Sequence, residues 1–481
     1  MAPSQERSGQ EADSAEPLGV VQNVEPSGPG GLAALQQLAG PGVSGISPAA
    51  VMALQRSAGN QAAGRAIAGA SGGRQLQRDL LDDIGNAVGD AFDARTDEER
   101  LDAEEELEDF RNETYEPLED NAPSSDVGLF DAACDMRAGT MTITLKVGYN
   151  FVAGDPTKVS AGFRPEEFQW APAEQTEWKT RYMRDVGAMW SAQFTISSTK
   201  PHWDAMTVAT TVNVVEDASD PHFTLTVAKY PPDAGMVQSS ICPPGYHHDS
   251  ASGNCAANTD AADESGTGEL DSNDMRPEQK LDWGNPTVQI PFTEGSSALG
   301  PAGSGALAPI ITQVAGVANA HVELTGHASS THRAGQTADQ GAIDNMDLAR
   351  QRTAAVRAAL IAGGASADQI LVRNVGEENA GPELDWCRVD AQVGTQEMQN
   401  PGLHETGHML GSDDEYPQTG AGAGTAVAAD YDAMIQSQTG DVVLRGRNSD
   451  AMSLGSTVRR WNYAAFTEAL ERMTGETEWT L

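Results

Sequence analysis

Basic residues are scarce in this chain of 481 residues. It has 30 lysines and arginines against 70 aspartates and glutamates, which gives a formal net charge of −40 at pH 7. Nucleic acids and anionic membrane surfaces are bound through clustered basic residues, so the composition argues against both as partners. The same acidity favours solubility.

Long apolar runs are missing as well. No stretch approaches the roughly 20 apolar residues that a transmembrane helix needs. Residues 1–7 lack the charged start followed by an apolar core that marks a Sec signal peptide. We therefore expect no transmembrane segment, and a chain made in the cytoplasm that leaves the cell, if it does, by a route other than Sec.

Cysteine is the third scarcity, with four residues in the chain. Cys242 and Cys255 bracket a short polar loop, and this spacing predicts a small disulfide, which would suit an oxidising destination. The loop also contains two adjacent histidines, so a metal-binding loop is the alternative; it is the weaker one because adjacent side chains diverge. Cys134 and Cys387 are expected to be buried free thiols.

One dense motif stands against these absences. His404, Glu405, His408, Gly411 and Asp414 follow the pattern HExxHxxGxxD. Residues i and i+4 of a helix lie one above the other, so both imidazoles can share one ion. Zinc accepts such nitrogens, and Glu405 can reach a water at an open position as general base. Gly411 permits the sharp turn that brings Asp414 back as a third ligand. The motif therefore predicts a Zn²⁺ site.

This pattern resembles the metzincin metalloproteases, with aspartate in place of the usual third histidine, a variant that the small bacterial snapalysin-type proteases share. The resemblance implies hydrolysis of a protein or peptide substrate, with the two histidines and Asp414 as ligands and Glu405 as base. Asp413 is the competing ligand if the turn is one residue tighter. Metzincins also have a methionine turn beneath the zinc, a role that the resemblance gives to Met452, with Met434 as its rival.

The N-terminal part has a different character. Residues 1–80 are rich in Gly, Ala, Ser, Pro and Gln and too poor in apolar residues to form a core, so we predict a disordered leader. Residues 54–63 (LQRSAGNQAA) are similar to a leader of proteins encoded with extracellular contractile injection systems, which are phage-tail-like particles. The resemblance implies that such a particle loads or delivers the chain. Residues 81–125 are acidic and are predicted to form a solvated helical spacer.

Residues 126–240 are folded. Apolar residues recur every four positions between Trp178 and Trp190 and predict an amphipathic helix. The order of elements resembles that of a metzincin N-terminal subdomain, whose sheet edge lies along the substrate cleft. Alternation predicts strands at 143–149, 208–214 and 223–227, the last of them as an edge strand. Residues 241–282 contain the Cys-bracketed loop and a stretch rich in Gly, Ser and Asp, which we interpret as a linker.

Residues 283–395 contain a second set of motifs. A strand ending in Gly326-His327 is followed by the helix pattern NMDLARQRTAAV at 345–356. These resemble the OmpA C-terminal domain, a βαβαβ-type module that binds the diaminopimelate of peptidoglycan with an arginine and an aspartate. Arg352 matches the arginine and is the candidate peptidoglycan-binding residue, with a structural role as the alternative. Ala328 stands where the aspartate should be, so we expect weak or absent binding.

The last segment, residues 396–481, is too short to bury a zinc helix on its own. We therefore predict an α+β fold in which a metzincin-like catalytic domain is interrupted by the OmpA-like domain. The rival arrangement packs the zinc helix on the OmpA-like sheet. The predicted function is that of a zinc metalloendopeptidase, as cargo or component of a contractile injection system. The alternatives are a non-catalytic cell-wall-binding protein and a particle-assembly protein with a structural metal.

Overall fold

The computed structural model describes residues 97–235, 237, 239–249, 254–258, 265–276, 287–317, 319–394, 398–415, 426–443, 445 and 449–481. Almost all of them belong to one compact unit, Glu99–Leu481. The expected leader at residues 1–80, with the motif predicted at 54–63, lies outside this part of the chain. Among the described residues, no helix has the length and apolar character needed to cross a bilayer.

The fold is mixed α+β, and its larger sheet is built around the long strand β3 (Thr140–Ala153). β3 lies between β5 (Thr207–Glu216) and β6 (Phe223–Lys229), and both run parallel to it. Among the described residues the strand order is β15-β4-β5-β3-β6-β10-β7, with β2 on β3 and β1 on β2. The other strands are β1 (Leu118–Asn121), β2 (Phe130–Asp135), β4 (Thr195–Ser198), β7 (Ser240–Cys242), β10 (Gly266–Asp271) and β15 (Trp479–Thr480).

The three predicted strands and the predicted helix all form. Successive side chains of a strand point to opposite faces, and β3 accordingly buries one alternating set. Helix α5 (Pro172–Trp190) contacts β5 and begins with a proline at a position that tolerates the missing N–H. The buried hydrophobic residues of β3 and α5 are Met141, Ile143, Leu145, Val147, Trp178, Tyr182, Val186 and Trp190.

Strand β6 is interior, so the prediction of an edge strand at 223–227 is wrong. β10 pairs with β6 in parallel, and β7 pairs antiparallel with β10. The sequence of β10, GTGELD, has the composition of a linker, but its glycines are needed for packing. A Cβ at Gly266 would lie 2.3 Å from Cε1 of Phe223, and one at Gly268 would lie 2.3 Å from Cδ1 of Ile241. Side chains of the neighbouring strands fill the space that these glycines leave open.

The segment beyond β7 holds the bracketed loop. Cys242, at the end of β7, forms a disulfide with Cys255, and their Cα atoms are 5.5 Å apart. Cys255 belongs to β9 (Asn254–Ala257), which pairs antiparallel with β8 (Tyr246–Asp249). The two cysteines are thus disulfide partners, and the hairpin is tied to the sheet.

The helix at residues 97–112 is not the solvated spacer that we predicted. Leu107 and Phe110 are buried in the main core, whereas Leu101 remains 57% exposed. The ring centroids of Phe110 and Trp203 are 4.9 Å apart, and Nε1 of Trp203 donates to the carbonyl of Ala103 at 3.2 Å. An apolar stripe of few residues is enough to dock this helix because two of them are large.

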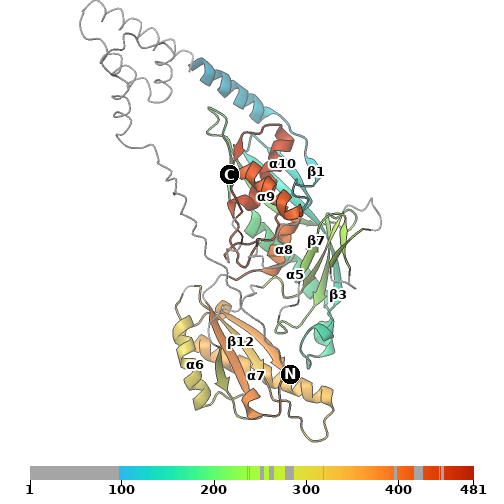
Figure 1. The fold of residues 1–481 in the computed structure, drawn as a ribbon, viewed down its shortest axis with the longest axis vertical. Helices are drawn as coiled ribbons and strands as arrows, with labels where there is room; N and C mark the ends of the chain where they lie inside the picture. The colour runs from blue at the N-terminus through green and yellow to red at the C-terminus, as the bar shows by residue number, and fades with distance from the viewer. Residues whose placement is uncertain are drawn as a thin grey trace, which may run out of the picture. The chain divides into compact units, whose positions relative to one another are not determined.

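Residues 288–394 form a second, inserted domain with its own hydrophobic core. Its sheet has the order β11-β14-β12-β13, with β12 parallel to β13 and antiparallel to β14. Helices α6 and α7 pack on this sheet (Figure 1). The elements are β11 (Val288–Pro291), α6 (Pro301–Val314), β12 (His321–His327), α7 (Ala338–Ala362), β13 (Ile370–Gly376) and β14 (Arg388–Gly394).

After the inserted domain the chain returns to the first core. Leu403 and Met409 of helix α8 (Pro401–Met409) share one hydrophobic core with Tyr182 and Trp190 of α5. The Trp190 indole donates to the carbonyl of Leu403 at 3.3 Å, and the hydroxyls of Tyr182 and Thr406 are 2.9 Å apart. Figure 1 shows α8 beside α5, and the two helices contact each other. Helix α10 (Ala464–Thr474) contacts α9 (Ala426–Thr439), and both contribute residues to the same core. Segments on both sides of the insertion therefore build one domain.

Candidate metal centre

The motif residues His404, Glu405 and His408 lie on helix α8, and specific residues begin and end this helix. Asn400 is the N-cap, and its side chain accepts from the amide of Leu403. Pro401 occupies the first helical position. Gly411 follows the helix with φ of +98°, a conformation that favours glycine, and a Cβ there would lie 2.8 Å from Cβ of Ala465. The chain therefore turns sharply at Gly411 and brings Asp414 back over the helix.

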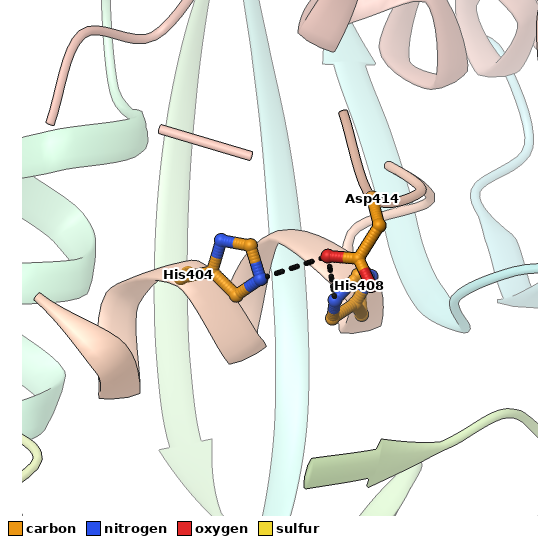
Figure 2. Close-up of side chains that lie close together, drawn as sticks. All are labelled: His404, His408 and Asp414. Atoms are coloured by element: carbon orange, nitrogen blue, oxygen red, sulfur yellow. Dashed lines mark hydrogen bonds and ion pairs between the residues drawn. The ribbon is translucent and has the colours of Figure 1, made fainter. Parts of the chain in front are cut away.

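The two histidines and Asp414 converge as predicted from their spacing. Nε2 of His404 is 3.1 Å and Nε2 of His408 is 3.5 Å from Oδ1 of Asp414 (Figure 2). The side chain of His404 is 2% exposed, whereas that of Asp414 is 40% exposed, so the cluster opens to solvent on the Asp414 side. Within the described residues, one ligand atom from each of the three lies within 4.8 Å of the others, a spacing suited to a metal ion.

Backbone carbonyls fix the orientation of both imidazoles. Nδ1 of His404 is 2.8 Å from the carbonyl oxygen of Ala451, and Nδ1 of His408 is 2.9 Å from that of Ser412. A carbonyl only accepts, so each Nδ1 carries the proton when the imidazole is neutral. Each Nε2 then presents its lone pair toward Asp414. Histidine ligands of zinc are held in the same way, by a hydrogen bond from the other ring nitrogen.

The electrostatics of the cluster match its geometry. Burial disfavours the charged form of His408, but the Asp414 carboxylate outweighs it and raises the pKa of His408 to about 9. Burial alone would raise the pKa of Asp414, yet the neighbouring histidines hold that pKa well below its usual range. Without a metal, the cluster thus holds a proton between an imidazole and a carboxylate. A divalent cation would take the place of that proton.

Asp413 does not join the cluster. Asp414, and not Asp413, supplies the carboxylate oxygen close to both imidazoles. Burial raises the pKa of Asp413 and outweighs the opposite effect of His408 and Arg445, whereas the pKa of Asp414 is lowered. The turn is therefore the longer of the two that the sequence allowed.

Met452 lies directly against the metal-motif helix. A Cβ at Gly407 would lie 2.2 Å from Sδ of Met452, so this glycine gives the methionine its space. Met452 is fully buried, and its carbonyl accepts from the amide of Glu415 at 2.7 Å. The preceding carbonyl, of Ala451, is the one that His404 contacts. The turn at Met452 thus supports one histidine and the loop that carries Asp414. Met434, the rival, is buried on α9.

Glu415 is a supporting residue that the sequence did not reveal. Its Oε1 accepts hydrogen bonds from the hydroxyl of Tyr431, the indole of Trp461 and the amide of Asn462, at 3.0, 2.8 and 3.0 Å. Burial raises the pKa of Glu415 to about 7. These three donors come from Tyr431 on α9 and from the segment at residues 461–462, so they anchor the residue next to Asp414. The one feature of the sequence that could have indicated this role is its position directly after Asp414, the last residue of the motif.

Glu405 lies next to the cluster and remains available. Only 4% of its surface is exposed. Among the residues that the structure describes, none forms a hydrogen bond or ion pair with its carboxylate, although the carboxylate acts electrostatically on His408 and Tyr182. A carboxylate in this position can accept a proton from a water beside the histidines.

A second cluster, Asp120, Asp131 and His222, has metal-like spacing but the wrong chemistry. The backbone N–H of Lys146 donates to Nδ1 of His222 at 3.0 Å, so the ring proton is on Nε2 and points at the carboxylates. The Lys146 ammonium lies 3.3 Å from both aspartates. The Lys146 ammonium and the His222 N–H already offset the charge of the two carboxylates, and His222 turns an N–H instead of a lone pair toward them.

The candidate peptidoglycan residue Arg352 is inside the inserted domain. It is fully buried, and its guanidinium donates to the carbonyls of Ser296, His327 and Thr293 at 3.0, 2.8 and 3.4 Å. Ala328 is fully buried as well. Arg352 thus holds together the domain's own loops, which is the structural alternative considered from the sequence.

Comparison with known proteins identifies the inserted domain. Residues 291–382 match the OmpA family, so the chain contains an OmpA-like domain. Similar solved structures include the OmpA-like domain of FopA1 from Francisella tularensis (18% identity, TM-score 0.19, 25% of this chain and 82% of that one). Another is the peptidoglycan-associated lipoprotein from Burkholderia pseudomallei (20% identity, TM-score 0.19, 22% and 89%). A third is the periplasmic domain of Helicobacter pylori MotB (18% identity, TM-score 0.18, 25% and 85%). No curated protein matches the chain.

Proposed function

We propose that the chain is a zinc-dependent metallopeptidase. The observation that carries the proposal is the arrangement of His404 and His408, whose Nδ1 atoms contact carbonyl oxygens while both Nε2 atoms face one carboxylate oxygen of Asp414. Two imidazoles and one carboxylate suit a catalytic zinc site, which keeps a further position open. The exposed side of Asp414 is where such a position would meet solvent and substrate.

The chain's own residues have distinct tasks in this proposal. His404, His408 and Asp414 would hold the ion, and bound zinc would supply a Lewis acid that polarises the peptide carbonyl. Glu405 would accept the proton of the attacking water and pass it to the leaving amine. A purely structural metal has no use for a free carboxylate beside it, so Glu405 favours a catalytic site over a structural one.

Variants at the motif test this proposal. His404→Ala should abolish stoichiometric zinc in the purified full-length chain, measured by metal analysis. Glu405→Gln should keep zinc and lose casein cleavage by about 10²–10⁴-fold, since an amide cannot accept the proton. Asp414→Asn should weaken zinc binding, and the neighbouring Asp413→Asn is the matched control that should not. Zinc retained in full by His404→Ala would refute the assignment.

We further propose that a contractile injection particle carries the chain as cargo. The support is the likeness of residues 54–63 to leaders of proteins encoded with such particles. Deleting residues 1–78 should leave the thermal midpoint unchanged and remove co-sedimentation with particles. Normal co-sedimentation of the truncated chain would contradict this role.

The second candidate function is a non-catalytic cell-wall-binding or assembly protein. The OmpA-like domain at residues 291–382 favours it, since such domains are typical peptidoglycan-binding modules. The buried state of Arg352 and Ala328 argues against a ligand at these two positions. Sedimentation of the full chain with purified sacculi decides between the two: strong binding without any peptide cleavage would establish the second candidate.

A further inference from the structure

The start of helix α8 depends on a turn that is distant in sequence. The amide of Gly402 lies in the first turn of the helix, where N–H groups have no partner within the helix. It donates to the carbonyl of Asp274 at 2.9 Å. A Cβ at Gly402 would lie 2.8 Å from Sδ of Met275. The turn at residues 271–276 therefore caps and contacts the helix two residues before His404.

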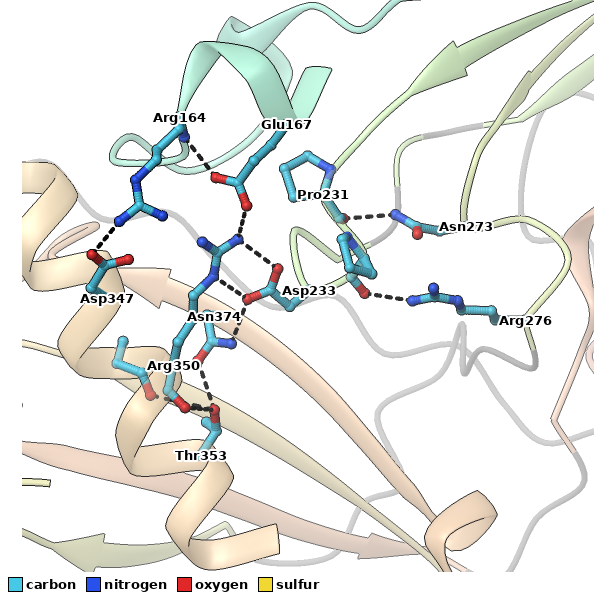
Figure 3. Close-up of polar contacts among 12 residues, drawn as sticks. Arg164, Glu167, Pro231, Asp233, Asn273, Arg276, Asp347, Arg350, Thr353 and Asn374 are labelled. Carbon is cyan, nitrogen blue, oxygen red and sulfur yellow. Dashed lines mark hydrogen bonds and ion pairs between the residues drawn. The ribbon is translucent and has the colours of Figure 1, made fainter. Parts of the chain in front are cut away.

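The turn at residues 271–276 is hydrogen-bonded to the loop at residues 230–233. The side-chain amide of Asn273 donates to the carbonyl of Pro231 at 3.0 Å. The guanidinium of Arg276 donates to the next carbonyl, of Pro232, also at 3.0 Å (Figure 3). Asn273 is 3% exposed, so its bond is formed inside the protein.

The OmpA-like domain binds the same loop at Asp233. The guanidinium of Arg350 on α7 donates to both carboxylate oxygens of Asp233, at 2.7 and 2.9 Å, and to Glu167 at 2.6 Å. Asn374 of β13 adds two bonds to Asp233: its backbone amide donates to the Asp233 carbonyl, and its side-chain amide to the carboxylate, both at 2.8 Å. Figure 3 shows Arg350 reaching out of α7 toward Asp233 and Glu167.

Apolar packing keeps this contact away from water. Met346 of α7 is fully buried and forms a small core with Phe163, Phe168 and Tyr230 from the large-sheet domain. The Arg350 guanidinium lies 4.9 Å from the centre of the Phe163 ring. The side chains of Arg350 and Asp233 are 21% and 15% exposed. A forked, shielded arginine–carboxylate pair is geometrically specific in a way that an exposed ion pair is not.

We propose that Arg350 and Asp233 are positioning residues for the metal centre. Through them, the OmpA-like domain holds helix α8 in position. The path runs from Arg350 to Asp233, through the carbonyls of Pro231 and Pro232 to the turn at 271–276, and from there to Gly402. The inserted domain thereby holds the helix that bears His404 and His408. The part that concerns zinc rests on the proposed function, while the part that concerns the helix does not.

Hydrogen exchange and zinc affinity, both measured on the full-length chain, test this proposal. Arg350→Ala should speed exchange at residues 230–235, 271–276 and 402–409 and weaken zinc binding, in competition with a chelator, by about tenfold, as for other residues that support metal ligands. Arg357→Ala is the matched control, because it removes an arginine of the same helix for which no ion pair is found among the described residues. It should leave both measurements unchanged.

Two further variants separate positioning from a general loss of folding. Arg350→Lys keeps the positive charge but loses the two-pronged guanidinium contact. It should therefore speed hydrogen exchange at the same residues as Arg350→Ala, but less, while exchange in the rest of the chain stays unchanged. Asp233→Arg combined with Arg350→Asp should restore part of the protection at 402–409. Faster exchange at 230–235 in Arg350→Ala with wild-type exchange at 402–409 would overturn the proposal, as would no change at 230–235. If the wild-type chain binds no zinc, the proposed function fails and the exchange result still decides this inference.

Discussion

Replacing Gly407 by alanine should destabilise the protein, although alanine is normally the better helix residue. The new Cβ would lie 2.2 Å from Sδ of Met452 and 2.9 Å from Cζ2 of Trp190. Non-bonded heavy atoms prefer a separation of about 3.5–4.0 Å, so both neighbours would have to move. Met452 and Trp190 are fully buried, which leaves them little room.

Two opposing effects set the size of the change. Alanine gains about 1 kcal/mol over glycine inside a helix. Overpacking a filled core typically costs about 1–3 kcal/mol, and a contact this short belongs at the upper end. We therefore expect a net loss of about 1–2 kcal/mol. Because the carbonyl of Ala451 next to Met452 orients His404, the variant should also bind zinc more weakly.

Urea unfolding at pH 7 measures the loss, and two further variants interpret it. Gly305→Ala, in α6, is the control, because a Cβ at this helical glycine would meet nothing within 4 Å, and it should stabilise or be neutral. In Gly407→Ala combined with Met452→Ala, the two costs should be less than additive by about 0.5–3 kcal/mol, since the clash disappears. A Gly407→Ala variant as stable as the wild type, or strict additivity in the double variant, would refute the contact between Met452 and the helix.

Three other predictions concern pH, packing and metal. Burial lowers the pKa of His222. The stability that the neutral imidazole contributes is therefore complete above the ordinary histidine pKa of about 6.5, and it is lost as the pH falls below that value. His222→Gln should flatten the decline of the urea midpoint between about pH 7 and 5. Gly266→Ala should cost about 1–3 kcal/mol in urea unfolding, because its Cβ would meet the Phe223 ring and the carbonyl of Cys242. A chelator should lower the thermal midpoint of the zinc-loaded chain, and added zinc should restore it; an unchanged midpoint would speak against a bound ion.

Local pattern was enough for much of the fold and for the core of the candidate site. Strands β3 and β5 and helix α5 follow from the spacing of apolar residues, which depends only on the period of each element. The convergence of His404 and His408 follows from the helical repeat, and the return of Asp414 follows from the glycine before it. The OmpA-like domain was recognisable from the motifs around Gly326 and at 345–356. Each of these features can be predicted from residues that lie close together in the sequence.

The errors lie where partners are far apart in sequence. β10 has the composition of a linker, and only the side chains of Phe223 and Ile241 show why its glycines belong in a sheet. The helix at 97–112 looked solvated because its partner Trp203 lies almost a hundred residues later. Arg352 is a different case: peptidoglycan binding by this residue stays a prediction, and in the fold its guanidinium donates to carbonyls of three separate positions.

What the sequence determined by itself is the set of side chains in the motif: two imidazoles and two carboxylates on one helix and its following turn. Tertiary structure decided how that helix is held. The carbonyl of Ala451, the donors to Glu415 and the cap from Asp274 all come from segments that lie well before or after the motif. Backbone carbonyls carry no signal of residue type, and their placement depends on the folding of the entire chain. The support of the site therefore became visible only in the folded protein.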